Sequence, residues 1–167
     1  MKRLISILLA ALPMLVMAQG SVSVTVDSVG QLSKKIDDKT KFQITELTIK
    51  GPLNSADLKL LQQIVNRSKA SEKKGESVVA IVDLSDAVFT EGKDARATDK
   101  LPGSLFSGAK QLQKAILPSG IANISKSCFD GCASLQTLTI PSTVTTIENQ
   151  AFQGCESLTA ITIPSSV

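Results

Sequence analysis

The chain has 167 residues, with 18 basic and 15 acidic side chains and no His, Trp or Tyr. The lack of His excludes Ser-His-Asp, Cys-His and His-ligated metal sites. The lack of Trp and Tyr removes the side chains that most often stack on sugars or anchor protein interfaces. We therefore expect a protein that is not an enzyme and that holds neither a cofactor nor a metal.

Residues 1–18 predict a secretory signal peptide. Two basic residues precede an apolar run from Leu4 to Val16. Small residues at Val16 and Ala18 suit cleavage just before Gln19. The run is short for a bilayer span, so we prefer this interpretation to a membrane anchor. We expect a protein that is secreted or held at the cell surface, with no membrane insertion of the mature chain.

The charge of the rest of the chain is nearly balanced. Residues 1–18 contain two of the basic side chains and none of the acidic ones, which leaves 16 basic and 15 acidic side chains after them. Nucleic acids and anionic lipids bind to concentrated positive charge, which this balance does not provide. We therefore expect no nucleic-acid partner.

Residues 19–100 predict an N-terminal α/β capping region with long, irregular leucine-rich repeats. Alternating Val residues indicate an edge strand over residues 22–26, and Asp27 or Ser28 can cap a short helix after it. The apolar residues of this helix would be Val29, Leu32 and Ile36. In a repeat protein, such a cap covers the apolar interior of the first coil.

A second, longer helix is predicted over residues 55–69. Asn54 is a favourable N-cap, with Asp57 three residues further on, and an apolar stripe follows. The stripe consists of Leu58, Leu61, Ile64 and Val65. Two charged and weakly patterned segments, residues 69–76 and 90–100, predict exposed loops.

A strand pattern, L-x-x-L-x-L, recurs along the chain. Its last three positions alternate inward, outward and inward, as in a β-strand. The five copies begin at Ile44, Val79, Leu112, Leu135 and Leu158. Five parallel strands are therefore expected.

Residues 101–167 form a regular repeat of 23 residues. Phe106, Phe129 and Phe152 share this spacing, and so do the glycines two residues after each of them. A Pro after each strand ends it, and the return segment has room for only one or two helical turns. Each unit is then one coil of an α/β leucine-rich-repeat solenoid, with parallel strands roughly 4.8 Å apart on the concave face. Since the chain stops in mid-unit at Val167, we expect the array to be truncated at its C-terminus.

The segment from Ala151 to Val167, AFQGCESLTAITIPSSV, resembles the repeat of BspA-like bacterial surface proteins. The likeness is strong over residues 101–167. It is looser from Ile44 to Phe89, which resembles the N-terminal region of such proteins in gut and oral anaerobes. The resemblance implies an extracellular or surface-attached repeat protein with a role in host-protein binding, adhesion or coaggregation.

Two of the three cysteines, Cys132 and Cys155, occupy the same position in successive repeats. A disulfide between stacked coils is one interpretation. We favour buried free thiols, because Ala109 fills this position in the first repeat and Cys packs as a small apolar side chain. Cys128 lies nearby in sequence, but zinc needs about four ligands, so no metal site is expected.

The outward strand face of the repeats is the candidate ligand-binding surface, because a solenoid presents a rigid row of side chains to a partner. The candidate residues are Gln113, Lys114, Ile116, Gln136, Thr137, Thr139, Thr159 and Thr162. Strand propensity alone also favours Thr at exposed strand positions, so a purely structural interpretation stays open.

The function expected from the sequence is protein–protein interaction or adhesion through this face, by a secreted or cell-surface protein. The partner would be a protein or a glycan, with host extracellular proteins among the candidates. The alternative is a structural spacer or a surface-layer component that has no specific ligand.

Overall fold

The computed structural model describes residues 16–18, 20–37, 41, 43–66, 78–91 and 96–167, so most of the predicted signal peptide lies outside the described residues. Residues 16–18 form β1 (Val16–Ala18), which pairs antiparallel with β2 (Ser21–Thr25). Cleavage after Ala18 would remove β1 and leave β2 at the edge of the sheet. Within the described part of the chain, no helix is long and apolar enough to cross a membrane.

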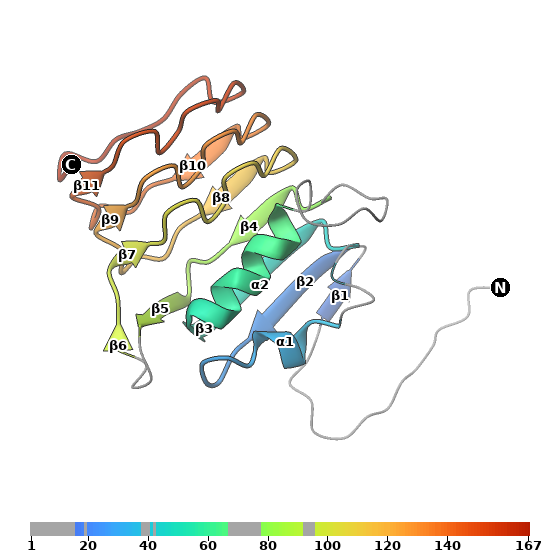
Figure 1. Cartoon of the computed structure of the whole chain (residues 1–167). Helices are drawn as coiled ribbons and strands as arrows, with labels where there is room; N and C mark the ends of the chain where they lie inside the picture. Colours follow the sequence, from blue (N-terminus) through green and yellow to red (C-terminus); the bar gives the residue numbers. More distant parts are fainter. Residues whose placement is uncertain (1–15, 19, 38–40, 42, 67–77, 92–95) are drawn as a thin grey trace.

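One sheet extends from the N-terminal region into the repeats (Figure 1). Its strands lie in the order β1-β2-β3-β4-β8-β10, where β3 spans Glu46–Leu53, β4 Ile81–Asp83, β8 Lys114–Ile116 and β10 Thr137–Thr139. All neighbours from β2 to β10 are parallel. Their register aligns a row of buried side chains, namely Val22, Leu47, Val82, Ala115 and Leu138. Four of the five predicted strands and the predicted α/β solenoid are therefore confirmed.

A second sheet of three short parallel strands links the regular coils. It consists of β7 (Lys100–Leu101), β9 (Asn123–Ile124) and β11 (Thr146–Ile147). The last copy of the strand pattern, residues 158–163, forms no strand, so the fifth predicted strand is wrong. This segment stacks on one side only within the described chain, and Ile163 is 47% exposed.

Phe106, Phe129 and Phe152 align along the body of the repeats. The ring centroids of Phe106 and Phe129 lie 4.9 Å apart, and those of Phe129 and Phe152 lie 5.6 Å apart. The glycines two residues after the rings have φ between 68° and 79°, a left-handed conformation that glycine adopts without strain. The 23-residue period is therefore the structural unit of this region.

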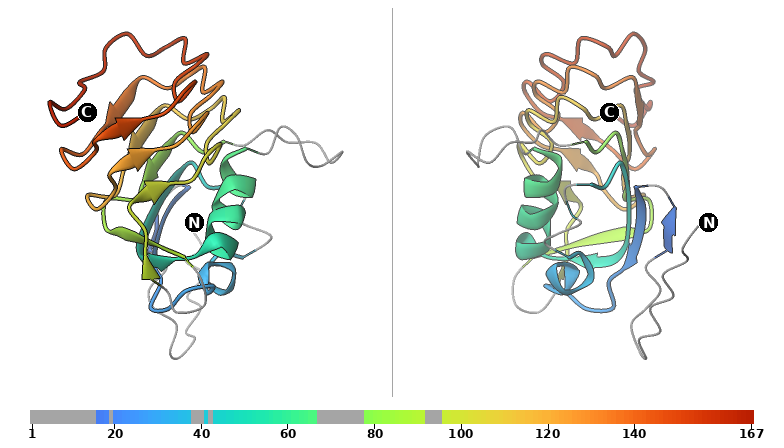
Figure 2. Two further views of the ribbon diagram at one scale, coloured as in Figure 1. Left: turned by 60° about the vertical axis from the view of Figure 1, so that its left-hand side comes forward. Right: turned by 90° about the vertical axis from the view of Figure 1, so that its right-hand side faces the viewer.

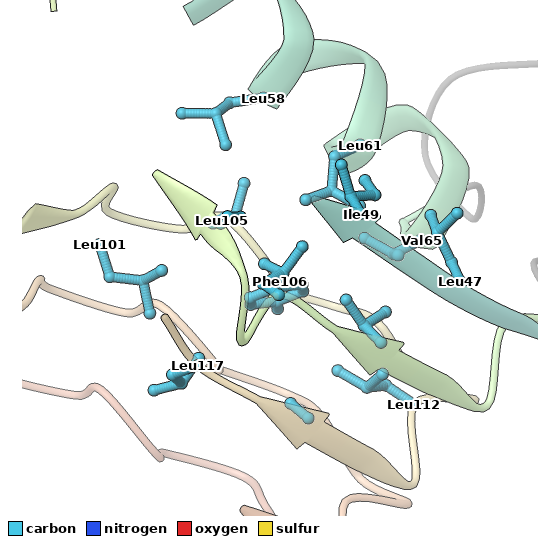
Figure 3. Close-up of a cluster of buried hydrophobic side chains, with 14 of the residues drawn as sticks. Leu47, Ile49, Leu58, Leu61, Val65, Leu101, Leu105, Phe106, Leu112 and Leu117 are labelled. Carbon is cyan, nitrogen blue, oxygen red and sulfur yellow. The ribbon is translucent and has the colours of Figure 1, made fainter. Parts of the chain in front are cut away.

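The second predicted helix is α2 (Ser55–Val65), which lies against one face of the sheet (Figure 2). Asn54 is the N-cap as predicted, and together with Asp57 it forms a capping box. The helix ends earlier than predicted, and the side-chain amide of Asn66 donates to the Leu105 carbonyl (3.3 Å). Figure 3 shows its apolar side chains Leu58, Leu61 and Val65 near Ile49 of β3 and near Leu105 and Phe106 of the first regular coil. α2 thus covers the apolar interior of that coil.

The first helix, α1 (Leu32–Lys35), begins later than predicted. Its N-cap residue is Gln31, which makes no side-chain cap, so the expectation that Asp27 or Ser28 caps it is wrong. The buried carboxylate of Asp57 takes this role from α2. It accepts hydrogen bonds from the backbone N–H groups of Gly30 (2.6 Å), Leu32 (3.0 Å) and Asn54 (3.0 Å).

The expectation of an exposed loop over residues 90–100 is wrong for residues 90–91, 96–97 and 100, which belong to strands, and its residues 92–95 lie outside the described residues. β5 (Ala87–Glu91) pairs with β3 and with β6 (Arg96–Ala97). Thr90 is 5% exposed, and its hydroxyl donates to the Leu53 carbonyl (3.1 Å). The strand forms because β3, far away in sequence, supplies a pairing edge. The loop predicted over residues 69–76 lies outside the described residues and stays a prediction.

All three cysteines are free thiols. Cys128 and Cys132 are buried, and Cys155 is half-buried. The Cys132 thiol donates to the Phe106 carbonyl (3.1 Å), and the Cys155 thiol to the Phe129 carbonyl (3.2 Å). The neighbouring Cys155 thiol, together with burial, raises the pKa of Cys132. The structure agrees with free thiols rather than with a disulfide.

Candidate functional site

The main sheet turns every second side chain away from the core, and the strand register arranges these side chains in two rows. The first row consists of Ser21, Glu46, Ile81, Lys114 and Thr137. The second row consists of Ser23, Thr48, Asp83, Ile116 and Thr139. We call these two rows the outward face.

The candidate residues from the sequence lie at or near this face. All of them are exposed except Ile116, which is half-buried. Register places Lys114 beside Thr137 and Ile116 beside Thr139, so these four belong to the outward face. Gln113 and Gln136 come just before β8 and β10, where the Gln136 N–H donates to the Gln113 carbonyl (2.8 Å). Thr159 and Thr162 lie in the last repeat, in the segment that forms no strand.

Although the candidate residues predicted from the sequence all lie in the repeats, the N-terminal strands contribute more than half of the outward face. Their residues on the face are Ser21, Ser23, Glu46, Thr48, Ile81 and Asp83. A signal was present, because the strand patterns that begin at Ile44 and Val79 already assign an outward position to residues 48 and 83. The face therefore spans both regions of the molecule.

The two acidic groups of the outward face, Glu46 and Asp83, lie on β3 and β4, and its one basic group, Lys114, lies on β8. Lys50, two residues after Thr48 on β3, has its Nζ 2.8 Å from the Asp86 carboxylate. The hydrogen bond to Asp86, the charge of Asp86 and that of Asp83 raise the pKa of Lys50. Among the described residues, no group of three or more His, Cys, Asp or Glu side chains is placed to hold a metal ion. The face is suited to noncovalent contacts with a polar surface.

A hollow of about 340 Å³ lies at the carboxyl ends of β4 and β8. Its lining comes from residues 85–89, Thr98 and residues 118–121. The two coils are still joined at Leu84, whose N–H donates to the Ile116 carbonyl (2.9 Å). Beyond this point the hollow lies between residues 87–89, which pair with β3, and residues 118–121. A second hollow, of about 210 Å³, lies between α2 and residues 102–105.

Comparison with known proteins bears on the repeats. Residues 96–167 match the family model described as BspA type Leucine rich repeat region (6 copies). Among solved structures, the chain is similar to a leucine rich cell surface protein from Faecalibacterium prausnitzii A2-165, with 18% sequence identity and a TM-score of 0.41. That match covers 81% of this chain and 30% of the other, so this chain spans less than a third of its length. A search of curated proteins finds no match.

Proposed function

Since the chain carries a BspA-type leucine-rich-repeat region over residues 96–167, we propose that it binds a protein partner through the outward face. The continuity of this face is the observation that supports the proposal: its two rows cross five parallel strands, from β2 to β10, in one sheet. Hydrogen-bonded strands hold their side chains in fixed positions. Little conformational entropy is then lost when a partner binds.

The proposal includes a location outside the cell or at its surface. The basic start, the apolar run and the small residues at the expected cleavage position support export. Adhesion to a host extracellular protein is the form of binding we propose. A glycan is the alternative ligand, and a structural spacer without a ligand is the alternative function.

The double variant Thr137→Lys/Thr139→Lys tests the outward face. Both side chains are exposed at the ends of the two rows, so the change adds charge and length without altering the core. The natural chain should bind saturably to at least one member of a panel of purified host extracellular proteins, as measured by biolayer interferometry. Affinity should fall about tenfold or more in the double variant, because two added ammonium groups disrupt a complementary contact.

Asn149→Lys/Gln153→Lys is the matched control, because it adds the same charge at exposed positions outside both rows. It should bind as the natural chain does. Equal binding by the two double variants would show that the outward face is not the binding surface. If no protein in the panel binds saturably, the spacer function is the better explanation.

A further inference from the structure

The hollow at the carboxyl ends of β4 and β8 combines apolar walls with a single charged residue. Phe89 and Ile121, which line it, are 2% and 1% exposed. Val88, also in the lining, is 48% exposed, which is unusual for a large apolar side chain in this chain. Asp86 is the one charged residue of the lining. A ligand that matches both features has an alkyl chain and a positive charge.

At the hollow, one coil lacks a side chain that the later coils have. Gly120 lies in the turn after β8, and Thr143 and Ser166 occupy the same position in the next two repeats. The Thr143 hydroxyl contacts the carbonyls of Ser119 (2.8 Å) and Ile121 (2.7 Å) in the preceding coil. Gly120 cannot make such a bridge, and a Cβ atom at this position would meet nothing within 4 Å.

The local charge favours a cation at the hollow. Lys50 interacts with two carboxylates, Asp86 at 2.8 Å and Asp83 at longer range. The Asp86 side chain is 59% exposed, and a carboxylate can accept several hydrogen bonds. Asp86 therefore has room for a second cationic donor beside Lys50.

We propose that the hollow binds a lysine or arginine side chain of the protein partner, with the alkyl stem against Val88 and Pro118 and the cation at Asp86. The position of the hollow indicates a partner side chain rather than a free amine. Asp83 and Ile116, in the second row of the outward face, each precede a lining residue by two positions. A segment that lies across the face would therefore pass the hollow. This inference rests on the proposed function for the identity of the partner, whereas the hollow can be tested with a peptide.

The test is an NMR titration of the isotope-labelled chain with a five-residue peptide, a capped alanine peptide with one central lysine. The amide resonances of Thr98 and Gly120 should shift saturably, with a dissociation constant in the millimolar range, because the contact is small and exposed. A second peptide, acetylated on the lysine Nε, keeps the stem and loses the charge. It should bind roughly threefold more weakly or worse.

Two variants that break the same ion pair should change peptide affinity in opposite directions. Asp86→Asn removes the proposed acceptor and should weaken binding roughly two- to fivefold. Lys50→Met removes the competing cation and should strengthen binding by a similar factor. Gly120→Leu should abolish binding, because Gly120 lines the hollow and the open space at its Cβ position leaves room for a leucine side chain where the ligand would lie. Ser142→Leu, at an exposed turn position one coil further on, is the matched control and should bind normally.

Weaker binding by both Lys50→Met and Asp86→Asn would mean that the ion pair acts on structure alone, and it would overturn the inference. Equal binding of the acetylated peptide, or unchanged binding by Gly120→Leu, would overturn it too. If butylamine binds as tightly as the lysine peptide, the site takes free alkylamines and a partner side chain is the wrong ligand. Thr137→Lys/Thr139→Lys should leave the titration unchanged, so this inference and the proposed function can fail separately.

Discussion

The N-terminal region, residues 20–91, and the repeats, residues 96–167, hold their cores together by different means. In the repeats, each coil makes the same contacts with the next. The N–H of Phe106 donates to the Cys128 carbonyl and that of Phe129 to the Ala151 carbonyl, both at 2.8 Å. In the N-terminal region, one carboxylate, that of Asp57, joins backbone groups from two helices. The 23-residue period of the sequence repeats the hydrogen bonds between coils, whereas the hydrogen bonds of Asp57 occur once in the molecule.

Charge follows the same division. Residues 20–100 hold 13 basic and 12 acidic side chains, and residues 101–167 hold three of each. The ion pairs Lys35–Asp27 and Lys50–Asp86 lie in the N-terminal region, and so do the buried polar residues Asp57 and Thr90. The repeats are stabilised mainly by stacked apolar side chains. A substitution in the repeats should therefore destabilise the neighbouring coils as well. A substitution in the N-terminal region should have a local effect.

Among the variants that test this comparison, Phe129→Ala should have the largest effect on the free energy of unfolding. Its ring is fully buried between those of Phe106 and Phe152, so its loss leaves a cavity between three coils. We expect the free energy of unfolding to fall by about 3–5 kcal/mol, as measured by urea denaturation. Phe152→Ala is the control, because this ring is only partly buried, and it should cost less. Equal costs for the two variants would argue against stacking as the basis of repeat stability.

Asp57→Asn should have the next largest effect, confined to the N-terminal region. An amide group has one acceptor oxygen in place of two, so at least one of the backbone N–H groups of Gly30, Leu32 and Asn54 loses its partner. The expected cost is about 2–3 kcal/mol. Amide hydrogen exchange should become faster at Gly30 and Leu32 and stay unchanged at Phe129. Asn54→Ala, which removes the other half of the capping box, should cost only about 1 kcal/mol. Faster exchange throughout the repeats would mean that the two regions unfold together.

The sequence predicted what depends on local pattern or on the repeat period. The Phe column, the capping box and four strands follow from residues close together or 23 residues apart. It did not predict the second role of Asp57, because Gly30 and Leu32 are 27 and 25 residues away. It also missed a left-handed residue in each coil, at Ser104, Ser127 and Gln150, with φ of 57°, 54° and 61°. Ser and Gln give no sign of this conformation, which recurs at one position of the 23-residue repeat.

The candidate site, too, could be predicted from the sequence only where it depends on a local pattern. The outward positions of the regular repeats follow from strand alternation, and four of the eight predicted residues lie on the outward face. The extension of that face into β2, β3 and β4 depends on the alignment of strands from units of unequal length. The hollow depends on the point where two coils separate, and Gly120 shows it only by comparison with Thr143 and Ser166. Such features arise from the arrangement of whole coils.

Removal of the ion pair between Lys50 and Asp86 should have the smallest effect on stability. The pH dependence of this effect tests whether charge contributes to the stability of the N-terminal region. The hydrogen bond and charge of Asp86, with the charge of Asp83, hold the pKa of Lys50 above its ordinary value of 10.5. The folded chain therefore binds this proton more tightly than the unfolded chain, so the stabilisation is present below pH 10.5 and is lost as the pH rises through the folded-state pKa. The difference in urea midpoint between the natural chain and Lys50→Met should shrink over that range. It should also shrink in high salt at neutral pH, because exposed charges are screened. A difference that grows with pH would mean that Lys50 acts on stability through the packing of its stem rather than through its charge.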